Sequence, residues 1–175
     1  AHVDDIICTG TDDDLTWLRT CLQSVYEIKH QMIRPGYDAR GVNLNRTIEW
    51  RRDVVTWTGN PKHARVLLDD WAMHDAKPVG TSVSMESMNV VSGSEEMSLD
   101  DARRFRSAAA RISYMAQGRP DLGLAACVLA TRMAKPMLGD SVALKRTLRY
   151  LAGQQTYTQL FPWQTLLTKE IHVFT

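Results

Sequence analysis

The sequence has little cysteine, no long apolar run and almost no net charge. Cys8, Cys21 and Cys127 lie far apart and form no Cys-x-x-Cys pair, which argues against a disulfide scaffold or a zinc site and favours a reducing compartment. No stretch of about eighteen apolar residues is present, so no transmembrane helix is expected. No signal peptide is recognisable either. We therefore expect an intracellular protein with no membrane partner.

The net charge of +1 hides an uneven distribution of charged residues. The first fourteen residues hold five Asp and neither Lys nor Arg, whereas residues 101–150 hold ten Lys/Arg against three Asp. A metal site in one segment and phosphate contacts in another would divide the charges in this way. On charge alone, helix faces whose cations only contact solvent explain the basic segment equally well.

The composition, 44% hydrophobic and 23% charged, is that of a globular protein of one domain or two small modules. Apolar residues repeat at helical spacing after several capping residues or prolines. Helices are predicted to begin at Thr11–Asp14, Asn60–Pro61, Ser98–Asp101, Pro120 and Asp140. A β-rich run spans 3–9, and residues 42–57 read as a hairpin that turns at 51–53. The pattern predicts an α+β fold that is mostly helical and ends in a small helical bundle.

Glycine and proline set the expected ends of these helices. The first helix is predicted to stop near Arg34-Pro35-Gly36, and the fourth, from Pro120, near Ala134. The last helix should stop at Gly153. Four of its apolar positions are expected to face the bundle: Val142, Leu144, Leu148 and Leu151. Residues 78–97, rich in Ser, Gly and Met, read as a linker or an ordered loop.

Asp4-Asp5 is the sharpest chemical feature of the sequence. Two adjacent carboxylates at a turn raise each other's pKa, and a divalent cation relieves that repulsion. Carboxylate oxygens suit Mg²⁺ or Mn²⁺, and a pair of such ions serves in-line phosphoryl transfer. Adjacent acids also occur by chance, and the neighbouring Asp12-Asp13-Asp14 reads as a solvated helix start.

Four segments resemble reverse transcriptases of copia-type retrotransposons, in the order and spacing of that family. His2-Val-Asp-Asp-Ile-Ile is similar to the Tyr/Phe-x-Asp-Asp hairpin of the polymerase palm. Met73-His-Asp-Ala-Lys-Pro-Val-Gly-Thr81 resembles a Met…Lys-Pro-Val-x-Thr stretch. Ser113-Tyr-Met-Ala-Gln-Gly-Arg-Pro-Asp-Leu122 and Ala143-Leu-Lys-Arg-Thr-Leu-Arg-Tyr-Leu-Ala-Gly153 resemble two further blocks, and the likeness covers roughly residues 1–160.

The resemblance implies a division of the chain into parts of a polymerase. Residues 1–76 would be a partial palm, with the Asp-Asp hairpin and a hairpin that resembles a primer grip. Residues 77–97 would be a linker, residues 98–155 a helical thumb and connection, and residues 156–175 a tail that leads to a ribonuclease H domain. His2 replaces the aromatic residue of the family hairpin, and Gly118 stands where the family has Thr.

By the same resemblance, the third palm carboxylate and the fingers belong to a segment that precedes this sequence. Ile171-His-Val-Phe-Thr175 resembles the first strand of the ribonuclease H domain, in which an Asp should follow. We therefore expect a fragment of a longer polyprotein, found in cytoplasmic virus-like particles or in the nucleus, that does not polymerise alone.

The family's functional roles carry over to particular residues. Asp4 and Asp5 would be the catalytic carboxylates, with Mg²⁺ or Mn²⁺ as cofactor. Template–primer of RNA and DNA, deoxynucleotide and the remainder of the polyprotein would be the partners. Contacts to nucleotide or primer are expected from His2, Arg46, Arg51 and Arg52. Contacts to the nucleic-acid backbone are expected from Arg103, Arg104, Lys145, Arg146 and Arg149.

A rival interpretation from another class is a non-catalytic helical module that binds nucleic acid or protein. Asp4-Asp5 would then be an ordinary turn, and the basic helices would be a docking face. The reading frame upstream of the sequence separates the two, because only the polymerase requires a preceding strand that bears a third Asp.

Overall fold

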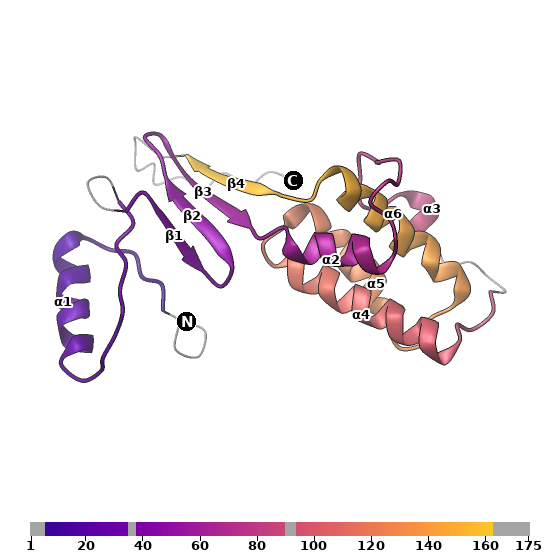
Figure 1. Cartoon of the computed structure of the whole chain (residues 1–175), viewed down its shortest axis with the longest axis horizontal. Coiled ribbons are helices and arrows are strands. Elements are labelled where there is room, and N and C mark those ends of the chain that lie inside the picture. The colour runs from indigo at the N-terminus through magenta and orange to yellow at the C-terminus, as the bar shows by residue number, and fades with distance from the viewer. Residues whose placement is uncertain (1–5, 35–37, 90–93, 163–175) are drawn as a thin grey trace, which may run out of the picture. The chain divides into compact units, whose positions relative to one another are not determined.

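The computed structural model describes residues 6–34, 38–89 and 94–162 (Figure 1). The chain divides into two compact units, residues 1–58 with 158–175 and residues 59–157. The first contains helix α1 and the sheet, and the second contains helices α2 to α6. The predicted α+β class is confirmed, and more of the described residues lie in helices than in strands. No helix in the described ranges combines the length and apolar character needed to span a membrane.

Helix α1 (Asp12–Gln23) begins as its sequence predicts but ends early. Thr11 is the N-cap and accepts a hydrogen bond from the Asp14 amide at 3.3 Å. The predicted end near Arg34 is wrong, because the Ser24 hydroxyl donates to the Cys21 carbonyl at 2.7 Å and closes the last turn. Val25 and Tyr26 then follow, a β-branched and an aromatic residue that both weaken helix formation. No residue of α1 is buried.

The sheet is antiparallel with strand order β1-β2-β3-β4. Its strands are β1 (Arg40–Asn43), β2 (Arg46–Trp50), β3 (Val54–Gly59) and β4 (Thr158–Pro162). Two-residue loops with positive φ at both positions match the twist of a hairpin, and Leu44 (φ 47°) and Asn45 (φ 60°) form such a turn between β1 and β2. The predicted turn at 51–53 is confirmed between β2 and β3, where the Arg51 amide donates to the Val54 carbonyl at 2.9 Å.

Two features of the sheet differ from the sequence-based expectation. The segment 42–57 is two hairpins rather than one, because the chain also reverses at residues 44–45. The run Ile6–Thr9 is no strand, and the described residues supply no neighbouring strand to pair with it. The rest of that predicted strand, residues 3–5, lies outside the described residues, as does the expected strand at 171–174.

The second unit is built from helices whose starts were largely predicted. Ser98 caps α4 by accepting from the Asp101 amide at 3.1 Å, and the Asn60 side chain accepts from the Lys62 amide at 2.9 Å at the start of α2. Pro120–Leu122 forms a 3₁₀ turn before α5, which ends at Thr131 instead of near Ala134. The helices are α2 (Lys62–Asp70), α3 (Met85–Met88), α4 (Leu99–Ala116), α5 (Gly123–Thr131) and α6 (Ser141–Gly153).

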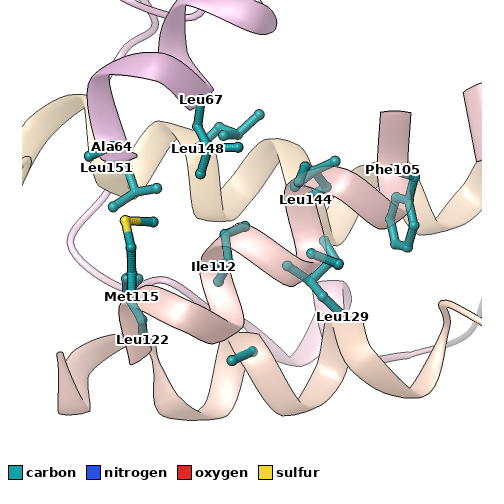
Figure 2. Close-up of a cluster of buried hydrophobic side chains, with 14 of the residues drawn as sticks. Ala64, Leu67, Phe105, Ile112, Met115, Leu122, Leu129, Leu144, Leu148 and Leu151 are labelled. Carbon is teal, nitrogen blue, oxygen red and sulfur yellow. The ribbon is translucent and has the colours of Figure 1, made fainter. Parts of the chain in front are cut away.

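The core of this unit joins α2, α4, α5 and α6 (Figure 2). Phe105, Ile112, Leu129, Leu144 and Leu148 are each fully buried. They lie on the apolar stripes that the sequence predicted for α4, α5 and α6, so the expected bundle is confirmed. Val142 is an exception, since it is 43% exposed and faces away from the core. The buried set is Ala64, Leu67, Leu68, Phe105, Ala108, Ala109, Ile112, Met115, Leu122, Ala126, Leu129, Ala143, Leu144, Leu148 and Leu151.

The predicted linker at 77–97 belongs to the helical unit in its described part. It contains α3, which is capped by reciprocal hydrogen bonds between Ser84 and Ser87. Arg132 is 9% exposed and donates to the carbonyls of Ser87 (3.2 Å) and Met88 (2.8 Å). The predicted parts of the chain were divided after residue 76, whereas the compact units divide after residue 58.

Candidate functional site

The predicted catalytic residues lie outside the described part of the chain. Asp4, Asp5 and His2 fall within residues 1–5, so their roles stay predictions. Within the described ranges, no group of three or more His, Cys, Asp or Glu residues is placed to hold a metal ion. The donor chemistry of Asp4 and Asp5, two carboxylates, nevertheless fits Mg²⁺ or Mn²⁺.

The three arginines expected at the primer end do not come together. Arg46 begins β2 beside the turn at residues 44–45, whereas Arg51 and Arg52 follow the other end of that strand. Five residues of extended chain separate Arg46 from Arg51 by roughly 17 Å. Arg51 is also held by Glu49, with nitrogen–oxygen distances of 2.7 and 3.1 Å. Arg46 therefore lies at the opposite end of β2 from Arg51 and Arg52.

The cations expected to contact the nucleic-acid backbone differ in whether they already form hydrogen bonds within the protein. Arg104 donates to the Asp70 carbonyl at 3.0 Å, and its guanidinium lies 5.0 Å from the centre of the Trp71 ring. Arg146 donates to the Thr81 hydroxyl at 2.8 Å. These arginines connect the end of α2 and the loop that follows it to α4 and α6. Fewer of their N–H groups are therefore free to bind a phosphate.

The other three cations of that set also differ among themselves. Arg149 donates to the Lys77 carbonyl at 2.8 Å. Arg103 lies 3.6 Å from the Asp100 carboxylate, and both side chains are more than four-fifths exposed. Lys145 is exposed and has no hydrogen bond or ion pair with a described residue.

A buried polar cluster joins two of the family-like blocks. Arg119 is 5% exposed and makes two hydrogen bonds to the Asp121 carboxylate, at 2.6 and 3.3 Å. The Tyr150 hydroxyl donates to the same carboxylate at 2.8 Å. Burial raises the pKa of Tyr150, and the bond to Asp121 and the charge of that carboxylate raise it further, against the opposing effect of Arg119. The block at residues 113–122 is thereby fixed to α6.

The block at residues 73–81 and the adjoining Ser82 lie next to the same part of the helical unit. The Ser82 hydroxyl donates to the Asp121 carbonyl at 2.8 Å, and the Thr147 hydroxyl donates to the Ser82 carbonyl at 3.2 Å. Gly153 lies so close to Pro78 that a Cβ at residue 153 would stand 2.8 Å from the Pro78 Cβ. The three blocks, far apart in sequence, therefore form one structural junction.

A shallow hollow of about 420 Å³ opens at this junction. Its lining is uncharged and consists of Pro78, Val79, Gly80, Tyr150, Gly153 and Gln154. The hydrogen bonds at this junction connect protein groups to one another. The sequence alone did not indicate this junction, because hydrogen-bonded partners lie up to 72 residues apart.

Comparison with known proteins shows which proteins the chain resembles. It is 30% and 31% identical, over 161 aligned residues, to the retrovirus-related Pol polyproteins from transposons RE1 and RE2 of Arabidopsis thaliana. Each alignment covers 87% of the chain. The chain is homologous to a segment of retrotransposon Pol polyproteins. This confirms the resemblance to the copia-type family.

The homology concerns only a small part of each polyprotein. The chain spans 10% of the length of each of these two Pol polyproteins. It also spans 60% of an uncharacterized mitochondrial protein of Arabidopsis thaliana, to which it is 29% identical over 153 residues. No family model matches this Pol-related chain, and no solved structure does.

Proposed function

We propose that this chain is the C-terminal part of a polymerase palm followed by a helical thumb and connection, within an RNA-directed DNA polymerase. The observation that carries the proposal is its homology to retrovirus-related Pol polyproteins over 87% of its length. The intact polymerase would extend a primer on an RNA or DNA template with deoxynucleotides. The remainder of the polyprotein would be its partner, in a cytoplasmic particle or in the nucleus.

Asp4 and Asp5 are the residues to which we assign the chemistry. Their carboxylates would hold Mg²⁺ or Mn²⁺, which stabilises the charge on the attacking and leaving oxygens of phosphoryl transfer. His2 would lie beside the nucleotide in place of the family's aromatic ring. Two adjacent carboxylates are too few to hold Mg²⁺ tightly, because that ion keeps its waters and demands octahedral geometry. The active polymerase therefore needs further ligands from outside this chain.

Primer extension tests the proposal in two proteins. The isolated 175-residue chain should incorporate no deoxynucleotide on a poly(rA)·oligo(dT) template with Mg²⁺ or Mn²⁺. A chimera in which this chain replaces the matched segment of the RE1 polyprotein should extend the primer. A chimera that melts as cooperatively as the unchanged RE1 protein measured beside it, and yet extends no primer, would contradict the proposal.

A further inference from the structure

Three cations of α2 and α4 have no side-chain hydrogen bond or ion pair with a described residue. Lys62 and Arg65 are exposed and stand one turn apart on α2, where residues i and i+3 share a face. Arg111 is half-buried on α4. The pKa of His63 is lowered by burial, then by the charge of Arg111 and then by that of Lys62. Arg111 of α4 and Lys62 of α2 therefore lie near the same imidazole.

The described structure contains no ion pair that involves these cations. None of Lys62, Arg65 and Arg111 forms an ion pair with a carboxylate of residues 6–34, 38–89 or 94–162. The first turn of α2 has no acidic residue, whereas the first turns of α1 and α4 have three and two. The positive end of the α2 dipole thus adds to the side-chain charges. An anionic partner would be attracted by the three side chains and by the N-terminal end of α2 together.

An exposed aromatic ring adjoins the cations. Tyr114 is 43% exposed on α4, and its ring centre lies 4.9 Å from that of His63, with the planes tilted by 59°. The lowered pKa keeps His63 mainly uncharged at neutral pH, so the two rings form an uncharged surface beside positive charges. Single-stranded nucleic acid is bound by this combination, in which cations contact phosphates and bases stack on aromatic rings.

We propose that Lys62, Arg65, Arg111 and Tyr114 form a binding surface for single-stranded nucleic acid. The three cations contact successive phosphates, and a base stacks on Tyr114. The surface rests on the proposed function only for the choice of nucleic acid over an acidic peptide. It replaces α6 as the main contact, because Arg146 and Arg149 on that helix are bonded to the loop at residues 77–81.

Fluorescence anisotropy of a dye-labelled oligo(dT), titrated with the full 175-residue chain at several salt concentrations, tests the surface. Changing Lys62, Arg65 and Arg111 together to Ala should make the slope of log K against log salt shallower by about 2, at about 0.7 for each lost phosphate contact to a single strand. Tyr114→Leu removes the ring but keeps an apolar side chain, and should weaken binding about five- to a hundred-fold. Tyr114→Phe keeps the aromatic ring and should retain the affinity for oligo(dT).

Matched variants keep the test specific. Lys77→Ala removes an exposed lysine that does not belong to the proposed binding surface, and it should leave the affinity for oligo(dT) unchanged. Unchanged melting temperatures of the variants exclude unfolding as the cause. A loss of affinity with Lys145→Ala and none with the triple variant would place the strand on α6 and overturn the proposal. Binding of polyaspartate but not of oligo(dT), lost in the same variants, would indicate an acidic protein partner and would also overturn it.

The outcome is independent of the polymerase assay. Oligo(dT) binding needs no divalent cation and is measured without one. If the RE1 chimera fails to extend primers while the surface variants still lose oligo(dT), the binding surface stands without the polymerase. If the chimera extends primers and the variants bind oligo(dT) normally, only the surface is refuted.

Discussion

Removing the Asp121 carboxylate should strongly destabilise the helical unit. Arg119 is 5% exposed, and besides its two bonds to Asp121 it donates to the Gln155 carbonyl at 3.2 Å. Asp121→Ala leaves that guanidinium buried without its counter-charge, and breaking a buried pair in this way costs about 3–5 kcal/mol. One kcal/mol lowers the melting temperature of a unit of this size by about 4–8 °C, so we expect a decrease of at least about 12 °C.

Circular dichroism during thermal and urea unfolding measures this effect. Arg103→Ala is the matched control, because its ion pair with Asp100 is almost fully exposed, and surface changes of this kind stay within about 0.5 kcal/mol. Changing Arg119 to Met and Asp121 to Leu together should cost less than Asp121→Ala alone, since no unpaired charge remains. If Asp121→Ala unfolds at the same temperature as Arg103→Ala, the buried pair does not stabilise the junction.

Three further predictions concern other parts of the chain. Gly153→Ala should destabilise the helical unit by about 1–3 kcal/mol in urea unfolding, because the new Cβ would meet the Pro78 ring at 2.8 Å. Leu44→Asn should slow hydrogen exchange in the β1–β2 hairpin, since Asn accepts the positive φ of this turn more readily than Leu. The lowered pKa of His63 means that its contribution to stability is present above pH 6.5 and is lost as the pH falls through the folded pKa; His63→Gln should therefore flatten the decrease in melting temperature below pH 6.5.

The helices could be predicted from local sequence because their signals are local. The Ser98 cap and the stripe of Phe105, Ile112 and Met115 specify α4 within a single segment, and all three apolar residues are buried. The early end of α1 was missed because Pro35 outweighed the weaker signals at residues 24–26. Helix starts were thus more accurately predicted than helix ends.

Features that depend on distant pairing could not be predicted. Strand β4 exists through its pairing with β3, in which Thr58 and Thr158 are opposite each other, one hundred residues apart. Leu44 in a turn with positive φ gives no sequence signal, because glycine or asparagine is the usual residue there. The sequence likewise indicated single basic residues but not which ones would be used by internal hydrogen bonds.

One part of the candidate functional residues could be predicted from the sequence, and another part could not. Asp4-Asp5 was recognised from adjacent letters and a family likeness, and lies outside the described residues. The surface of Lys62, Arg65 and Arg111 was missed because it combines residues of α2 and α4, two helices that are not consecutive in the chain.

The most direct test of the polymerase assignment is single-turnover primer extension by the RE1 chimera with one carboxylate changed at a time. Asp4→Asn should lower the rate by roughly a hundred-fold or more, because a catalytic metal supplies several kcal/mol of charge stabilisation. Asp13→Asn, which alters an exposed carboxylate in the first turn of α1, should leave the rate unchanged. Equal rates for the two variants would contradict the assignment of Asp4 as a catalytic residue.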